Sequence, residues 1–140
     1  MKNIMDYDTV ALDEKNNAIV IIDQTKLPYS TEILSLKTQK EIWNAIYLLQ
    51  VRGAPAIGVT AAMGIYLAAR EIKADSFEDF YRQFKEASDY LDSARPTAVN
   101  LSWALKRMGK IVENNSEKRI PEIVAALRKE AIEIRDEDIR

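Results

Sequence analysis

The sequence predicts an α+β fold that is mostly helical, with a small N-terminal antiparallel sheet of two to three strands followed by a bundle of about five helices. Two observations support this prediction. Short runs rich in β-branched side chains alternate with polar turns before Thr38, whereas apolar residues recur every three to four positions after it. The chain has 140 residues, of which 47% are hydrophobic, so it is long enough to bury the core of one domain.

The N-terminal sheet is predicted from a hairpin pattern. Asp8–Leu12 and Ala18–Asp23 are two short runs, and the second is rich in Ile and Val. The polar residues 13–17 between them form the turn. Pro28 prevents the second run from continuing as a central strand, because proline cannot donate a hydrogen bond to a neighbouring strand. Thr31–Leu36 then adds a short third strand.

Two helices are predicted next. Thr38 followed by Glu41 forms a capping box, so the first helix runs from about Thr38 to Gln50. Pro55 suits the first turn of a helix, and the second helix runs from there to about Ile72. We expect this second helix at the centre of the bundle, because its small residues allow neighbouring helices to approach closely on several sides. Those residues are Ala56, Gly58, Ala61, Ala62, Gly64, Ala68 and Ala69.

The third predicted helix begins at one of two possible caps. Either Asp75 pairs with Glu78, or Ser76 pairs with Asp79. An aromatic stripe follows at helical spacing, and we interpret it as core packing rather than as a ligand-binding surface. The apolar face consists of Phe77, Phe80, Tyr81, Phe84, Ala87 and Leu91.

Two further helices complete the predicted bundle. The fourth runs from about Thr97 to Glu113 and is ended by Asn114-Asn115-Ser116. The last runs from Ile120 or Pro121 to about Asp138, with one apolar face and many charges on the other. The inward residues of the fourth are Leu101, Ala104, Leu105, Met108, Ile111 and Val112, and those of the last are Ile123, Leu127, Ala131 and Ile134.

Composition excludes several classes of function. The chain has no cysteine and no histidine, so it lacks a thiol nucleophile, the commonest general base and the commonest metal ligands. The net charge of -2, with both signs mixed along the chain, argues against nucleic acid or an anionic membrane as a partner. Met1–Val10 lacks the apolar region of a secretory signal, and the uncharged run Gly53–Ala69 is too short and too rich in Ala for a membrane span. We therefore expect a cytoplasmic protein whose partner is a small molecule or another protein.

Two turns share one design that favours anion binding. Arg52-Gly53-Ala54-Pro55 and Ala94-Arg95-Pro96-Thr97 each place an arginine and a proline just before a helix start. Helix starts offer unpaired N–H groups and partial positive charge, and arginine adds a forked, permanently charged donor, so the pair suits a phosphate or sulfate monoester. The alternative is that each arginine lies on the surface or pairs with a carboxylate. The anion interpretation also requires that the two turns meet in space.

Other polar residues give weaker evidence for a binding or catalytic site than the two arginine turns do. Asn100 is either a cap in the first turn of its helix or a ligand contact. Asp23-Gln24-Thr25 either forms a turn, which we favour, or faces a site. Several acidic residues lie in or beside the hairpin, whereas Asp89, Asp92 and the C-terminal acids are interpreted as solvated. No pair among all of these is isolated in an apolar setting that would raise a pKa for acid–base catalysis.

The two arginine turns extend into longer motifs. These are Val51-Arg52-Gly53-Ala54-Pro55-Ala56-Ile57-Gly58 and Ala94-Arg95-Pro96-Thr97-Ala98-Val99-Asn100-Leu101 with Trp103-Ala104-Leu105, preceded by Asp23-Gln24-Thr25 with Leu27-Pro28. In this order and spacing they resemble the N-terminal part of the methylthioribose-1-phosphate isomerases of methionine salvage. That family belongs to a superfamily with the regulatory subunits of the initiation factor that exchanges guanine nucleotide and with ribose-1,5-bisphosphate isomerase. The resemblance covers nearly the whole chain.

The resemblance implies that residues 1–140 form the N-terminal domain of a larger two-domain protein, whose C-terminal Rossmann-like catalytic domain is absent from this sequence. The implied reaction is the aldose–ketose isomerisation of 5-methylthioribose 1-phosphate to 5-methylthioribulose 1-phosphate, with no required cofactor and no metal. Position by position, Arg52, Gly53, Ala54 and Arg95 match the family's substrate-binding residues. The expected partners are a small phosphorylated sugar and, in the full-length protein, a second copy in a homodimer.

The sequence also departs from the family. The family's catalytic cysteine and aspartate lie in the C-terminal domain, so no catalytic residue is assigned in this chain, and the chain alone is predicted to be inactive. One alternative is a regulatory or sugar-phosphate-sensing binding module related to the initiation-factor subunits. Another is a helical assembly domain whose arginines form only salt bridges.

Overall fold

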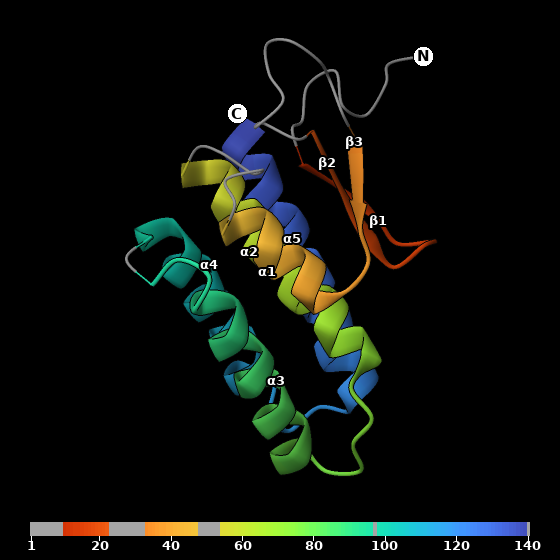
Figure 1. Cartoon of the computed structure of the whole chain (residues 1–140). Coiled ribbons are helices and arrows are strands. Elements are labelled where there is room, and N and C mark those ends of the chain that lie inside the picture. The colour runs from red at the N-terminus through yellow and green to blue at the C-terminus, as the bar shows by residue number, and fades with distance from the viewer. Residues whose placement is uncertain (1–9, 23–32, 48–53, 97, 140) are drawn as a thin grey trace, which may run out of the picture.

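A computed structural model describes residues 10–22, 33–47, 54–96 and 98–139. Three strands are followed by five helices in this part of the chain, which confirms the predicted mostly helical α+β fold (Figure 1). The strands are β1 (Val10–Asp13), β2 (Ala18–Ile22) and β3 (Ile33–Leu36), and the helices are α1 (Gln39–Tyr47), α2 (Ala54–Glu71), α3 (Phe77–Asp92), α4 (Val99–Asn114) and α5 (Ile120–Ile139).

The three strands form one antiparallel sheet in the order β1-β2-β3. Ile19 of β2 lies opposite Leu12 of β1 and Leu36 of β3, so these three side chains share one face. Ile19 is fully buried and Leu36 nearly so, and both belong to the same core as the helices. The predicted hairpin and third strand are therefore confirmed, except that Asp13 is the last residue of β1 rather than part of the turn.

The hairpin turn is attached to the helical bundle through Glu14. Its carboxylate accepts hydrogen bonds from Arg128 of α5 at 2.6 and 2.9 Å and from the Tyr66 hydroxyl of α2 at 2.8 Å. The Arg128 guanidinium, more than any other group, holds the pKa of Glu14 below its usual range. Glu14 thus joins the hairpin to partners that lie 52 and 114 residues away in the sequence.

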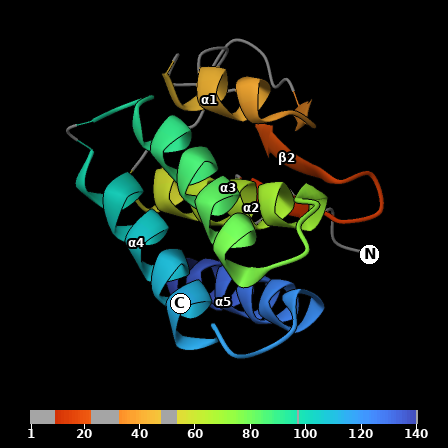
Figure 2. The same ribbon diagram turned by 90° about the horizontal axis from the view of Figure 1, so that it is seen from below.

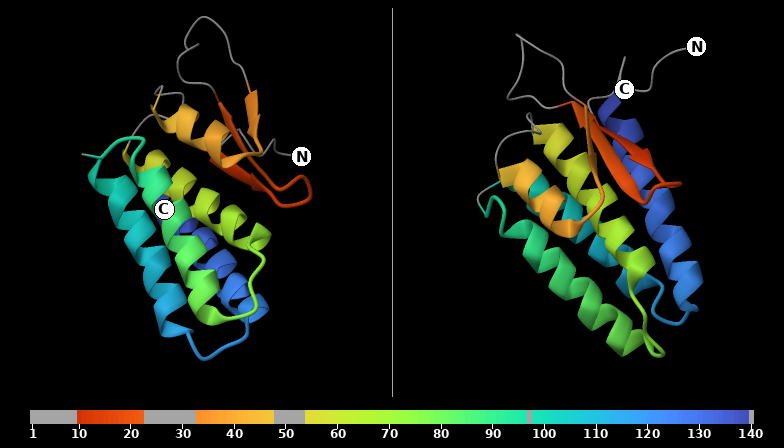
Figure 3. Two further views of the ribbon diagram at one scale, coloured as in Figure 1. Left: turned by 60° about the horizontal axis from the view of Figure 1, so that its bottom comes forward. Right: turned by 45° about the vertical axis from the view of Figure 1, so that its right-hand side comes forward.

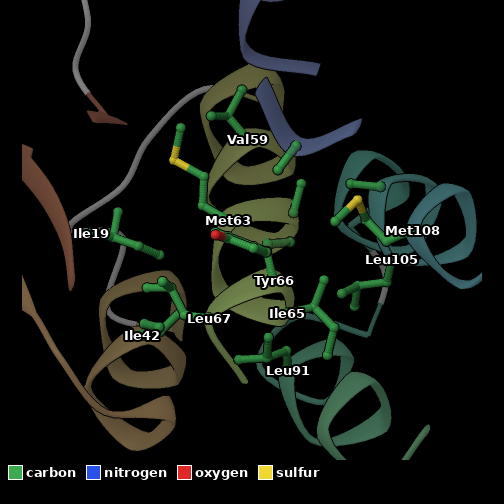
Figure 4. Packing of buried hydrophobic residues seen from close by; sticks show 14 of the residues in the cluster. Ile19, Ile42, Val59, Met63, Ile65, Tyr66, Leu67, Leu91, Leu105 and Met108 are labelled. Atoms are coloured by element: carbon green, nitrogen blue, oxygen red, sulfur yellow. The ribbon is translucent and has the colours of Figure 1, made fainter. Parts of the chain in front are cut away.

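Helix α2 lies at the centre of the bundle, as its small residues predicted. Figure 2 shows α1, α3, α4 and α5 arranged around it, and the sheet packs against it as well. In Figure 4, Met63 lies toward Ile19, Leu67 toward Ile42 of α1, and Ile65 toward Leu91 of α3. All of these side chains are at most 2% exposed, so a single hydrophobic core joins both parts of the fold.

Two glycines of α2 mark where neighbouring elements approach most closely. A Cβ at Gly58 would lie 3.3 Å from the backbone oxygen of Asn100 in the first turn of α4. A Cβ at Gly64 would lie 3.2 Å from Ile42 of α1 and 3.4 Å from Leu91 of α3. A larger residue at either position would therefore push a neighbouring helix outward.

The helix starts differ in how they are capped. Glu41 N–H donates to the Thr38 hydroxyl at 3.1 Å while the Glu41 carboxylate accepts from Thr38 N–H at 3.0 Å, which is the predicted capping box. Of the two caps proposed for α3, Ser76 is the one present, since its hydroxyl accepts from Asp79 N–H at 3.2 Å. By contrast, α4 begins at Val99 rather than near residue 97, and its N-cap residue, Ala98, makes no side-chain hydrogen bond to it.

Candidate functional site

The predicted site residues fall partly outside the described residues. Arg52 and Gly53 lie outside them, as do Thr97 and the stretch 23–25. Ala54 is the first residue of α2. Arg95 lies in the turn between α3 and α4 and is half-buried. The geometry of the candidate site is therefore built from Arg95 and the two helix starts.

The starts of α2 and α4 are neighbours. Both lie at the same end of the bundle (Figure 3), and the close approach of Gly58 to the backbone of Asn100 brings the first turn of α4 against α2. This end also contains the C-terminal turn of α5 (Figure 1). The fold thus places the beginnings of the two helices that follow the arginine turns side by side.

These two helix starts also share an unusual electrostatic feature. Neither α2 nor α4 has an acidic residue in its first turn, whereas α1, α3 and α5 all do. The N-cap residue of α4 is Ala98, which makes no side-chain hydrogen bond to the helix. The N-cap residue therefore leaves the first N–H groups of α4 without a side-chain cap, while the Asp92 carboxylate accepts a hydrogen bond from the Ser102 hydroxyl, one turn into the helix, at 2.6 Å.

Arg95 differs from the other arginines in the described ranges, because its side chain alone has no hydrogen bond or ion pair within them. Each of the others has an acidic or carbonyl partner: Arg70, Arg82, Arg107, Arg119, Arg128 and Arg135. The alternative that Arg95 pairs with a carboxylate therefore has no support among the described residues. A half-buried arginine in the turn before a helix whose N-cap residue makes no side-chain bond is a favourable setting for an anion.

Asn100 does not act as the cap of α4. It is the second residue of the helix, and its backbone oxygen is the atom that faces Gly58. The first of its two predicted roles is therefore wrong, because the helix begins two residues later than expected. A ligand contact by its half-buried side chain stays a prediction.

The described residues offer little acid–base chemistry. Three carboxylates have a shifted pKa, and each shift is downward: Asp13 through the Asn16 side chain, Glu14 through Arg128, and Glu41 through the backbone N–H of Lys37. A general acid at neutral pH requires the opposite shift. No cluster of His, Cys, Asp and Glu suited to a metal ion occurs within the described ranges.

Other features of the described part do not include Arg95. Arg95 lines neither of two surface cavities, of about 280 and 270 Å³, although the first of them extends along α3 and α4 as far as Asp92 and Ser102. Arg107 of α4 binds Glu130 and Glu137 of α5 and lies over the ring of Trp103, so it clamps the two helices together. The described helices include none that combines the length and apolarity needed to cross a bilayer.

Comparison with known proteins places these observations in a family. The sequence model of the initiation factor 2 subunit family matches residues 50–140. The chain is 53% identical over 133 residues to methylthioribose-1-phosphate isomerase of Symbiobacterium thermophilum, and 48% identical over 127 residues to 5-deoxyribose 1-phosphate isomerase of Clostridium botulinum. These alignments cover 95% and 91% of this chain, but 37% and 36% of the relatives. The chain therefore spans little more than a third of the length of these relatives.

Two solved structures have the same fold over this region. The crystal structure of 5-methylthioribose 1-phosphate isomerase from Pyrococcus horikoshii OT3 matches with a TM-score of 0.86 at 40% identity, and that of subunit delta of the translation initiation factor eIF-2B from A. fulgidus with 0.81 at 34% identity. Each match covers 92% of this chain and 36% of the solved chain. Because the family model extends over α2 to α5 and over both arginine turns, this chain belongs to the initiation factor 2 subunit family.

Proposed function

We propose that this chain is the N-terminal domain of an aldose–ketose isomerase that converts 5-methylthioribose 1-phosphate to 5-methylthioribulose 1-phosphate. In this proposal Arg52, Gly53, Ala54 and Arg95 bind the substrate. The proton transfers belong to a second, Rossmann-like domain that follows in the complete protein. The names of the two isomerase relatives support the substrate class, since both act on a ribose 1-phosphate that lacks the 5-hydroxyl group.

One observation carries the binding role: the starts of α2 and α4 are adjacent, neither helix has an acidic residue of its own in the first turn, and Arg95 lies in the turn before α4. A phosphate ester placed there accepts hydrogen bonds from backbone N–H groups and from a guanidinium fork. Gly53, just before α2, allows the backbone to come close to the ester, because it has no side chain to obstruct the approach. This domain therefore orients and neutralises the phosphate while the other domain acts on the sugar.

The proposal is tested in a chimera, defined as this chain joined to the remainder of the Symbiobacterium thermophilum relative beyond its aligned segment. Arg95→Ala and Arg52→Ala should each raise the KM for methylthioribose 1-phosphate roughly 10- to 100-fold, since a hydrogen bond to a charged group contributes about 1.5–3 kcal/mol. Arg82→Ala is the matched control, because Arg82 is an exposed arginine that pairs with Asp79 and Glu86 on α3. An inactive chimera, or unchanged KM and rate in both test variants, would contradict the binding role.

A second candidate function is a regulatory or sugar-phosphate-sensing module. The fold match to subunit delta of eIF-2B supports it, because that relative shares the same N-terminal architecture without being named an isomerase. The complete coding sequence separates the two candidates. A second domain that contains both a cysteine and an aspartate at the family's catalytic positions favours the isomerase, and loss of these residues favours the regulator.

A further inference from the structure

An aromatic cluster on the surface connects α1 to the end of α3. We define it as Trp43 and Tyr47 of α1 with Tyr90 of α3. The Trp43 ring stacks on Tyr47 with centroids 4.9 Å apart and on Tyr90 with centroids 6.1 Å apart. Tyr47 and Tyr90 are 58% and 40% exposed, so the cluster contributes less by burial than the core residues beneath it.

One directional hydrogen bond fixes this cluster. The indole Nε1–H of Trp43 donates to the Ser93 hydroxyl at 2.9 Å, and that hydroxyl in turn donates to the Tyr90 carbonyl at 2.6 Å. Ser93 is the C-cap residue of α3 and therefore ends that helix. The bond joins residues 50 positions apart, so it sets the spacing between α1 and the turn after α3.

Each residue of this hydrogen bond precedes one of the two arginine turns in the sequence. Ser93 lies two residues before Arg95, and α1 leads through residues 48–53 to the start of α2. Beneath the cluster, Gly64 allows Ile42 and Leu91 to pack against α2 at one point. The end of α3, which leads to Arg95, and α1 thus both pack on α2 at Gly64 and are joined at the surface by the Trp43–Ser93 bond.

We propose that Trp43 and Ser93 are positioning residues for the sugar-phosphate site, and this inference rests on the function proposed above. Their hydrogen bond holds the Arg95 turn in its binding geometry before the ligand arrives. Without the bond, the turn must be ordered at the moment of binding, and this cost weakens affinity. Neither residue touches the reacting atoms in this proposal, so the loss falls on KM rather than on kcat.

The test uses Trp43→Phe, Ser93→Ala and the double variant in the chimera. Loss of one hydrogen bond of about 1 kcal/mol should raise KM about fivefold, with kcat within about twofold of the parent value. The double variant should be no worse than Ser93→Ala alone, because Ser93→Ala already removes the hydrogen bond that Trp43→Phe removes. Ser93→Thr keeps the hydroxyl and should restore the parent KM.

Tyr81→Phe is the matched structural control. It removes a surface hydrogen bond of 2.7 Å between Tyr81 in the first half of α3 and Glu113 in the last turn of α4, whereas the candidate site lies at the start of α4. It should lower the melting temperature about as much as Ser93→Ala while leaving KM unchanged. A shift in KM with Ser93→Ala that is absent with Tyr81→Phe supports the positioning role.

The outcomes separate this inference from the proposed function. If Arg95→Ala raises KM but Trp43→Phe and Ser93→Ala leave it unchanged, the positioning role is wrong and the binding role stands. If Arg95→Ala also has no effect, the proposed function fails. Should Trp43→Phe not fold, Ser93→Ala decides alone, since it removes only an exposed hydroxyl.

Discussion

Replacing Gly58 by alanine tests how closely α2 and α4 must approach, and the same replacement at Gly64 and at Gly109 provides the comparison. Gly109 of α4 has open space around the position of a Cβ, since nothing lies within 4 Å. At Gly64 the new methyl would meet the side chains of Ile42 and Leu91. At Gly58 it would meet the backbone oxygen of Asn100 at 3.3 Å. The added methyl group therefore faces open space at Gly109, side chains at Gly64 and a backbone oxygen at Gly58.

The expected free-energy changes follow from these contacts. Alanine stabilises a helix interior by about 1 kcal/mol relative to glycine, so Gly109→Ala should raise the melting temperature by about 3 °C. At Gly58 the same gain is opposed by about 1–3 kcal/mol of overpacking, because a backbone oxygen cannot rotate away as a side chain can. Gly58→Ala should therefore be neutral or destabilising by up to about 2 kcal/mol. Gly64→Ala should lie between the two, since Ile42 and Leu91 can adjust in part.

Thermal and urea unfolding of the 140-residue chain measure these differences. In the chimera, Gly58→Ala should also raise KM, because it displaces the first turn of α4 and the neighbouring Arg95 turn, whereas Gly109→Ala should leave KM unchanged. The reasoning fails if Gly58→Ala stabilises the chain as much as Gly109→Ala does. It fails equally if the two variants have the same KM.

Three further predictions concern activity and stability. The 140-residue chain alone should not turn over methylthioribose 1-phosphate, and product above a buffer control would refute its assignment as a non-catalytic domain. Glu14→Gln should cost about 1 kcal/mol at pH 7, a modest value because the carboxylate is 33% exposed and its partner Arg128 49% exposed. Since folding lowers the pKa of Glu14, this stabilisation is present above the unfolded pKa of about 4 and is lost as pH falls through the lower folded value. Urea unfolding at pH 7 and pH 3 should therefore show the gap between parent and Glu14→Gln shrinking in acid, and a constant gap would contradict the ion-pair explanation. Thr38→Ala should cost about 1 kcal/mol by removing one half of the capping box, and unchanged unfolding in urea would show that Glu41 caps α1 alone.

Local patterns in the sequence were sufficient to predict the individual helices and strands. The capping box at Thr38, the β-branched residues of β2 and the apolar periodicity of α3 to α5 are short-range signals, and each element lies where these signals predicted it, within a few residues. The central position of α2 also followed from sequence, because only a helix of small residues tolerates neighbours on several sides. The start of α4 was placed about two residues too early, because its N-cap residue is Ala98, whose side chain cannot form the hydrogen bond by which a cap is recognised in a sequence.

The sequence by itself determined the elements, the small residues of α2 and the two arginine turns as candidate anion sites. Only the tertiary structure decided that the starts of α2 and α4 lie together, that Arg95 has no partner in the described ranges, and that Glu14 and Trp43 join distant segments. The physical reason is the distance along the chain over which each kind of interaction acts. Helix caps and periodicity act over a few residues, whereas these contacts join residues about 40 to 114 positions apart and depend on how the helices pack.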